Sequence, residues 1–236
     1  MPAGEREGNA KASGAPRRGR PPRVSPADIV DAAVVLLRAE PGEPLTMARV
    51  ANAVGLTPMA LYRHFKDRDE LMEEVVRRVL QERNAAVVRD GSWQDQLRSW
   101  VRSGLEYLTP CAQVLQDVYA GGSSRWLLGA ATLARILEQA GFAGDELAAM
   151  QLWVAMSVDG YVLVSASRPR GLDLSEAYAA LAHLPPEDAD RMAHLIPRLE
   201  GAVGRLDEQF TDHLVETVEA ARKPEPPPRP SSRRRA

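Results

Sequence analysis

Apolar residues in the first third of the chain recur at intervals of three and four, the spacing of amphipathic helices, and each run follows a recognisable cap. Ser25 stands three residues before Asp28, the pattern of a capping box. Thr46 and Thr57 precede the second and third runs, and Asp67 precedes a fourth. The first three caps are flanked by apolar pairs at the spacing of a hydrophobic staple: Val24 with Ile29, Leu45 with Val50, and Leu56 with Leu61. The pattern predicts short helices with fixed entry angles.

Two of these helices are joined by a tight turn. The second helix should span about Met47 to Val54, and Gly55 follows at the position where a left-handed residue ends a helix. Thr57 then begins the third helix directly after the turn. This pattern predicts a helix-turn-helix, although a plain corner between two helices of an all-helical protein would look the same.

The rest of the chain also has the pattern of helices, because no segment alternates like a strand or carries the turn of a hairpin. We therefore expect an all-α fold, with a three-helix helix-turn-helix domain over residues 25–85 and a larger helical domain over residues 86–221. Segment 145–167 is apolar nearly all round, which predicts burial on more than one side. One side would face the protomer's own core and the other a partner subunit.

Two features bear on where the protein works. Gln151, Ser157 and Asp159 interrupt the longest apolar run, which argues against a membrane span. No apolar signal region follows the first residues, and one cysteine, Cys111, cannot form an intramolecular disulfide. We expect a cytoplasmic protein with no membrane partner.

Charge is distributed unevenly along the chain. The net charge is only −2, but residues 1–24 carry a net +4 and residues 222–236 a net +5, so residues 25–221 carry −11. Both ends lack apolar periodicity and are expected to be disordered. A polyanion would be repelled by the middle of the chain and attracted by its two basic ends.

The third helix has the composition of a nucleic-acid contact. No acidic residue occurs from Thr46 to Lys66, a stretch of 21 positions in an acid-rich chain. A groove lined by phosphates would repel any carboxylate placed there. Leu61 and Phe65 are four residues apart and should face inward, which turns the remaining side chains outward. The corner is therefore best explained as a DNA-binding helix-turn-helix.

Each outward side chain has a chemical partner on a DNA duplex. Arg63 can read a guanine edge with two hydrogen bonds, and Met59 and Ala60 can contact a thymine methyl group. Other side chains can donate to the phosphate backbone. These backbone candidates are Tyr62, His64 and Lys66, together with Thr46 and Thr57 at the two helix starts.

The segment LTMARVANAVGLTPMALYRHFKDRDELMEEVV, residues 45–76, resembles the DNA-binding region of the TetR (tetracycline-repressor-like) family of bacterial transcription regulators. The run Leu61 to Lys66 and the following Glu70-Leu71 carry the resemblance. By position, the phosphate-contacting residues of the family match Tyr62, His64 and Lys66, and the base-facing positions match Met59, Ala60 and Arg63. The chain departs from the family at Ala60, where many members carry threonine or serine and can form a hydrogen bond.

The resemblance also implies how the protein works. It implies an all-α homodimer that binds a palindromic operator, most often as a repressor, and releases it when a small-molecule effector occupies the C-terminal domain. Segment 145–167 and a last helix, about residues 202–221, would form a four-helix bundle across the two-fold axis. Phe210, Leu214 and Val218 have suitable spacing for that contact.

An effector pocket should be apolar with a few polar groups. Ordinary core packing explains any single aromatic or methionine candidate, but Asp159 lies within an apolar helix and needs a partner. That partner would be an arginine at the dimer interface or a cationic or hydrogen-bonding ligand. The candidates are Trp100, Tyr107, Tyr119, Trp126, Trp153, Met156 and Asp159. No metal or cofactor motif occurs, and Cys111 is expected to be a buried small hydrophobe.

Two other classes of function compete with a regulator. A helical enzyme is disfavoured, because the chain has no nucleophile elbow, phosphate-binding glycine loop, HExxH motif or clustered carboxylate pair. An architectural protein that binds AT-rich DNA stays an alternative, with the basic N-terminal arm as its dominant contact.

The N-terminal arm contains RRGRPPR, residues 17–23. Its core, Arg18-Gly19-Arg20-Pro21, resembles an AT-hook, in which arginines lie along a narrow minor groove. Glycine lets the backbone approach the groove floor and proline keeps the chain extended. Because the arm ends two residues before the Ser25 cap, we expect Arg18 and Arg20 to form a second DNA contact beside the helix-turn-helix.

Overall fold

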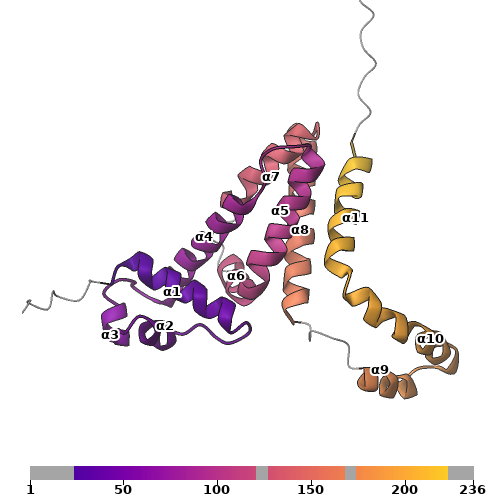
Figure 1. The fold of residues 1–236 in the computed structure, drawn as a ribbon, viewed down its shortest axis with the longest axis horizontal. Helices are drawn as coiled ribbons and strands as arrows, with labels where there is room; N and C mark the ends of the chain where they lie inside the picture. Colours follow the sequence, from indigo (N-terminus) through magenta and orange to yellow (C-terminus); the bar gives the residue numbers. More distant parts are fainter. Residues whose placement is uncertain (1–23, 121–126, 168–173, 223–236) are drawn as a thin grey trace, which may run out of the picture.

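The computed structural model describes residues 24–120, 127–167 and 174–222, and within these ranges every regular element is a helix (Figure 1). The first helices are α1 (Pro26–Ala39), α2 (Met47–Ala53), α3 (Pro58–Leu61) and α4 (Arg68–Ala86). The following elements are α5 (Trp93–Leu108), the 3₁₀ helix η1 (Thr109–Cys111), α6 (Ala112–Ala120), α7 (Leu127–Gln139), α8 (Gly144–Ser167), α9 (Leu174–Ala180), the 3₁₀ helix η3 (Leu181–His183), α10 (Pro186–Val203) and α11 (Leu206–Ala220). The all-α class expected from the sequence is confirmed.

The first four helices begin where their caps predict. Ser25 and Asp28 form a complete capping box, in which the Asp28 carboxylate accepts the Ser25 N–H at 2.8 Å. The other caps accept a backbone N–H three residues on: Thr46 from Arg49 at 3.3 Å, Thr57 from Ala60 at 3.2 Å, and Asp67 from Glu70 at 2.9 Å. Gly55 takes φ +69° in the turn between α2 and α3, a conformation that glycine adopts without strain.

Helix α4 connects the two parts of the molecule. Its first half packs on α1, and further along it packs on α5, α6 and α7 (Figure 1). Leu71, Val75 and Val79 lie on one face of α4 and are fully buried. One continuous apolar core therefore runs from Ile29 of α1 to Val218 of α11.

Helix α8 has two different faces. Val154, Val158 and Val162 are buried against α5 and α7, whereas the opposite face is open to solvent. Among the described residues α8 is the one helix with the length and composition of a membrane-crossing segment, a test that core helices of soluble proteins also pass. Its most apolar stretch is 17% buried within the protomer.

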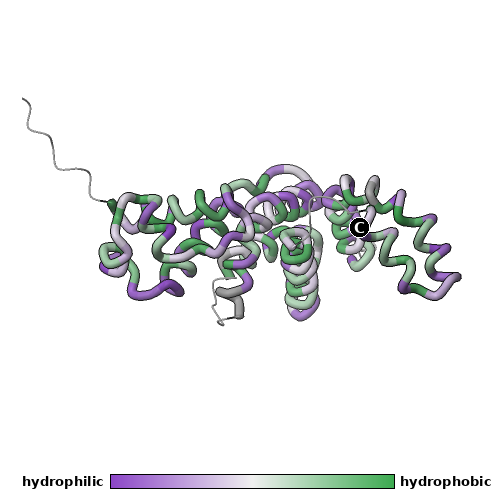
Figure 2. Tube along the Cα trace, turned by 90° about the horizontal axis from the view of Figure 1, so that it is seen from below, coloured by the Kyte–Doolittle hydropathy of each residue, from purple (hydrophilic) through white to green (hydrophobic). Residues whose placement is uncertain are grey.

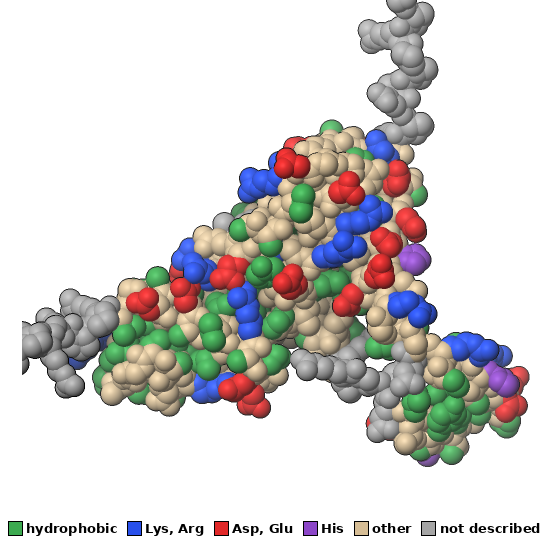
Figure 3. Space-filling model, viewed as in Figure 1, with side chains coloured by type: hydrophobic (Ala, Val, Ile, Leu, Met, Phe, Trp, Pro, Cys, Tyr) green, Lys and Arg blue, Asp and Glu red, His purple; other side chains and the backbone are tan. Residues whose placement is uncertain are grey.

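Helices α9 and α10 pack mainly on each other and lie apart from the rest of the chain at the lower right of Figure 1. Hydrophobic and hydrophilic stretches alternate along them, as along most of the helices (Figure 2). Hydrophobic side chains gather on the face of this pair that is turned to the viewer in Figure 3. Tyr178 and Leu195 are 45% and 42% exposed.

The last helix differs from the expectation. The segment expected as one helix over 202–221 divides into the end of α10 and the separate helix α11. Leu214 and Val218 are buried within the protomer, where α11 packs on α5, and Phe210 stacks on Tyr161 with ring centroids 4.2 Å apart. The line of residues expected to face a partner subunit is thus used inside the protomer, because its apolar spacing fits α5 and α8 equally well.

Candidate nucleic-acid interface and interior site

Helix α3 is a single turn that presents its side chains on both sides. Leu61 and Phe65 are buried, at 0% and 4% exposure, and anchor the segment in the core. Met59 and Tyr62 are exposed, at 73% and 49%, and Arg63 is exposed beside them. The base-facing candidates Met59 and Arg63 therefore lie on an accessible surface.

The remaining candidates lie around this turn. Ala60 and His64 are half-buried, and Lys66 is exposed. The Lys66 N–H donates to the Glu70 carboxylate at 2.6 Å, while its ammonium lies 3.6 Å from Asp67 and is solvent-exposed. An ion pair this exposed to solvent is weak. The Lys66 ammonium can therefore leave Asp67 and bind a phosphate instead. Thr46 and Thr57 are exposed at the starts of α2 and α3.

Two arginines near this surface were missed by sequence reasoning. Arg49 pairs with Glu40 and donates to the Pro44 carbonyl at 2.6 Å. Arg68 donates from Nε to the Leu45 carbonyl at 3.2 Å. Both side chains fasten the segment before α2. One indication of this role was in the sequence: Arg49 and Arg68 lie in the first turns of α2 and α4, just after the caps of these helices.

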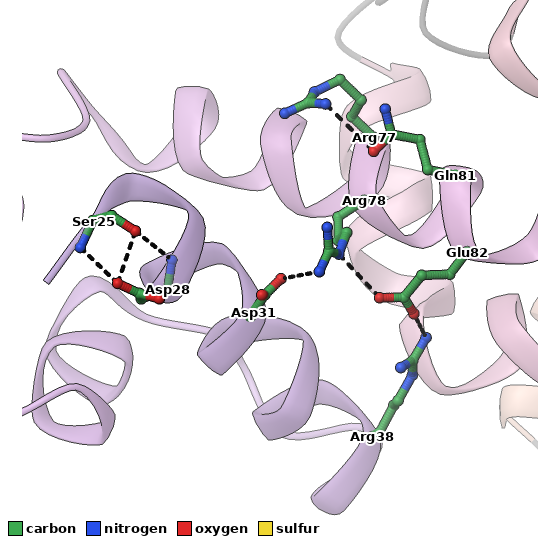
Figure 4. A network of polar contacts seen from close by, with 8 residues as sticks. All are labelled: Ser25, Asp28, Asp31, Arg38, Arg77, Arg78, Gln81 and Glu82. Carbon is green, nitrogen blue, oxygen red and sulfur yellow. Dashed lines mark hydrogen bonds and ion pairs between the residues drawn. The ribbon is translucent and has the colours of Figure 1, made fainter.

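Ion pairs fasten α1 to α4 (Figure 4). Arg78 Nη2 lies 2.8 Å from Asp31 of α1, and Arg78 Nε lies 3.1 Å from Glu82 of α4. Glu82 also lies 2.6 Å from Arg38 of α1. Charges of alternating sign thus join the first helix, α1, to α4, the helix that continues toward α5, α6 and α7.

The predicted effector residues do not converge. Trp100 is buried, and Tyr107 is half-buried with the Arg38 guanidinium 5.3 Å from its ring centroid. Trp153 and Met156 lie on the exposed face of α8, at 42% and 71% exposure. Trp126 and the side chain of Tyr119 lie outside the described residues, as do Arg18 and Arg20 of the N-terminal arm. The sequence alone identified the aromatic residues but not whether each side chain faces the core or the solvent.

One residue of the interior was not foreseen. Arg83 of α4 is 3% exposed, and its guanidinium carbon lies 3.9 Å from the centroid of the Trp100 ring. Asp159 of α8 is half-buried, and burial raises the pKa of its carboxyl while the Arg83 charge lowers it. Arg83 continues the apolar face of α4 at the spacing that follows Val79 and Leu80, which is the signal that could have found it.

Two open grooves lie elsewhere on the described surface. The first, of about 680 Å³, runs between α5, α8 and α11. The second, of about 1100 Å³, lies between the α1–α2 connection, η1 with α6, and the end of α8. Neither is lined by Trp100, Tyr107, Trp153, Met156 or Asp159, the effector candidates whose side chains the structure describes. Both are surface hollows, and the buried Arg83 and Trp100 lie apart from them.

The described residues contain neither a candidate metal site nor an accessible thiol. No group of three histidine, cysteine or acidic side chains that could hold a metal occurs among these residues. Cys111 is 1% exposed, and burial raises the pKa of its thiol to about 11. It packs as a small hydrophobe, as expected.

The fold is shared with several solved regulators. Apo ActR from Streptomyces coelicolor superposes with a TM-score of 0.65 at 22% identity, over 84% of this chain and 95% of that one. ActR in complex with actinorhodin gives 0.64 at 21% identity, over 84% and 98%. BioQ with its double-stranded DNA operator gives 0.55 at 21% identity, over 84% and 99%. At these identities the likeness concerns the fold.

Sequence relatives point the same way. Residues 29–75 match the family described as bacterial regulatory proteins, tetR family. The HTH-type transcriptional repressor DrrR1 of Streptomyces coeruleorubidus is 30% identical over 158 residues, 64% of this chain and 56% of that protein. The nucleoid occlusion factor SlmA of Marinobacter nauticus is 42% identical over 48 residues, 20% of this chain and 25% of that protein. The matches thus span about half or less of these relatives. The capped helix-turn-helix and these matches agree, and residues 29–75 are the N-terminal region of the tetR family of bacterial regulatory proteins.

Proposed function

We propose that the protein is a ligand-responsive regulator of transcription, a repressor that binds a palindromic operator as a homodimer and leaves it when a small molecule occupies the larger domain. The observation that carries the proposal is the exposed, carboxylate-free surface of α3 held on a buried Leu61 and Phe65. Such a surface meets phosphates without repulsion and presents Arg63 to base edges. DrrR1 is named a repressor, BioQ was solved with an operator and ActR with actinorhodin, which supports each part of the proposal.

The division of labour follows from the domains. Residues 25–85 would bind DNA and residues 86–221 would bind the effector and dimerise, without enzymatic activity, in the cytoplasm. The phosphate contacts would come from Tyr62, His64 and Lys66, and from Thr46 and Thr57. Arg18 and Arg20 of the basic arm would add contacts in the adjacent minor groove.

The open face of α8 supports the homodimer. Leu152, Met156 and Val164 lie on this face at intervals of four or eight, and they are 57%, 71% and 49% exposed. Gly160 occupies the remaining position of the stripe, where the absence of a side chain lets another helix approach closely. A contiguous apolar stripe of this kind marks a protein contact. A two-fold axis through it would bring two α8 helices together.

Selection of bound duplexes from random DNA tests the proposal. We expect a palindrome whose half-sites lie about one helical turn or more apart, since a dimer presents two α3 helices. AT-rich output without a palindrome, abolished by deleting residues 1–24 and unchanged by Arg63→Ala, would establish the architectural alternative instead.

A further inference from the structure

The connection between α1 and α2, residues 41–45, leads directly into the helix-turn-helix. Residues 41–44 are exposed, and Gly42 takes φ +92°. Leu45, at the end of the connection, is buried, at 2% exposure. An exposed segment of this kind has few packing contacts of its own. Its path therefore depends on what holds its last residues, which directly precede Thr46, the cap of α2.

Two arginines donate to successive carbonyl groups at this point. Arg49 of α2 donates from Nη1 to the Pro44 carbonyl at 2.6 Å, and its Nη2 pairs with Glu40, the residue that caps the end of α1. Arg68 of α4 donates from Nε to the Leu45 carbonyl at 3.2 Å. The end of the connection is thus joined to α1, α2 and α4.

These hydrogen bonds determine the orientation of two peptide groups. In a planar trans peptide the C=O and the following N–H point in opposite directions, and no peptide bond among the described residues is cis. The Leu45 carbonyl shares its peptide group with the Thr46 N–H. Arg68 therefore fixes the direction in which the chain enters α2, and Arg49 fixes the peptide group before it.

We propose that Arg49 and Arg68 are positioning residues for DNA binding, which orient α2 and α3 toward the duplex without contacting it themselves. This inference rests on the proposed function and adds residues that orient its DNA-binding surface. Because α2 packs on both α1 and α3, a change in the direction of α2 is passed on to α3. The charge of Arg49 is already paired with Glu40 inside this part of the protein.

The hydrogen bonds require a guanidinium group rather than a positive charge alone. Arg49 uses two nitrogens for two different partners, and Arg68 uses Nε, where lysine has a methylene group. A phosphate contact, in contrast, can be made by either arginine or lysine, because it depends mainly on charge. Substitution by lysine therefore separates a positioning role from a direct phosphate contact.

DNA binding by full-length Arg49→Lys and Arg68→Lys tests the proposal. The probe is the duplex that the wild-type protein selects, titrated at several salt concentrations. We expect each variant to bind about tenfold more weakly, since one hydrogen bond from a charged group contributes roughly this much. The dependence of affinity on salt should stay as in the wild type, because no charge is removed.

Arg77→Lys is the matched control. Arg77 also uses its guanidinium, donating from Nε to Glu74 at 2.8 Å, but this contact lies within α4 and holds no connecting segment. Its replacement should leave the affinity for the duplex unchanged. An equal loss of affinity in Arg77→Lys would show that any shortened arginine weakens binding, and would overturn the proposal.

Hydrogen exchange in the DNA-free protein provides a second measurement. The Val50 N–H donates to the Thr46 carbonyl at 3.1 Å at the start of α2, and the Ile29 N–H donates to the Ser25 carbonyl at 3.2 Å at the start of α1. In both lysine variants we expect the Val50 amide to exchange severalfold faster and the Ile29 amide to exchange as in the wild type. Equal acceleration of both amides would mean that the arginines support the whole fold, which contradicts a positioning role.

The proposed function and this inference fail in different ways. Wild-type affinity in both lysine variants would overturn the positioning role alone, because charge would then be sufficient. A wild-type protein that selects no duplex would overturn the regulator function and, with it, a role of these arginines in DNA binding.

Discussion

Arg38 of α1 lies with its Nη2 atom 2.6 Å from Glu82 Oε2 of α4, while its guanidinium carbon lies 5.3 Å from the centroid of the Tyr107 ring of α5. One side chain of α1 thus contacts two further helices, α4 and α5. Because Glu82 lies on α4 and Tyr107 on α5, a shift of either helix relative to α1 would change a contact of Arg38.

A double-mutant cycle on Arg38 and Glu82 should measure this tie. We expect a coupling of about 0.2–1 kcal/mol from urea unfolding, since both side chains are about one-third exposed and solvent screens the pair. The ion pair between Glu74 and Arg77 serves as the control, because it lies within α4 and joins no second helix. The Arg38–Glu82 cycle should also change effector-induced DNA release, and the control cycle should not. Equal effects on release from both cycles would contradict a role at the junction.

Two substitutions around α3 should separate base reading from phosphate binding. Arg63→Ala is expected to cost about 1–3 kcal/mol at particular operator base pairs. Lys66→Ala should weaken all sequences alike and reduce the dependence of affinity on salt, because it removes one phosphate contact. Binding isotherms for the operator and point-substituted operators, each at several salt concentrations, give both quantities. A uniform loss from Arg63→Ala would remove it from the base-reading set.

The buried anchor of α3 should matter more for stability than its exposed neighbour. Leu61 is fully buried, so Leu61→Ala should lower the free energy of unfolding by about 2–5 kcal/mol. Met59 is 73% exposed, and Met59→Ala should stay within about 0.5 kcal/mol of wild type. Urea denaturation compares them directly. A large loss from Met59→Ala would mean that it packs in the core.

Cys111 should resist thiol reagents in the folded protein. Its thiol is buried with a pKa near 11, so almost no thiolate exists at pH 8. We expect no reaction with an aromatic disulfide reagent under native conditions and one equivalent after unfolding in urea. Because burial raises the pKa of this thiol from its ordinary value of 9.0 to about 11, the thiol favours the folded state below pH 9, and that contribution falls as the pH rises toward 11. Fast native labelling would contradict the burial.

The open stripe of α8 should control association. Leu152→Glu introduces charge into a side chain that is 57% exposed, and we expect it to shift the protein toward monomer in light scattering. Leu127→Glu is the matched control, since Leu127 is similarly exposed, at 54%, but starts α7. If both variants associate like wild type, the dimer uses another surface.

The sequence predicted what local chemistry determines. The caps Ser25, Thr46 and Thr57 each accept a backbone N–H only three residues further on. The helix starts and the turn at Gly55 could therefore be predicted from the local sequence. Interior contacts were harder, because Arg83 is accommodated by residues from three other helices. Its burial depends on Trp100 and on two glycines that periodicity does not connect with it.

The sequence also did not show which element covers each apolar helix face. Spacing at Phe210, Leu214 and Val218 correctly indicated that a face of α11 is buried. Spacing does not say against what, and the protomer's own α5 and α8 cover it. In the same way, the all-round apolar pattern of α8 predicted two covered sides, of which the protomer covers one.

The continuity of α4 has a consequence for cooperativity. The family match ends at Val75, in the middle of a helix that runs from Arg68 to Ala86 without a break. Its early residues complete the core around Ile29, and its later ones fill the larger domain, so no flexible linker separates two independently melting units. The two parts should therefore lose their structure in one concerted transition. Recognition of DNA and of its effector would then be built into one thermodynamic unit, in which stabilising one end raises the cost of opening the other.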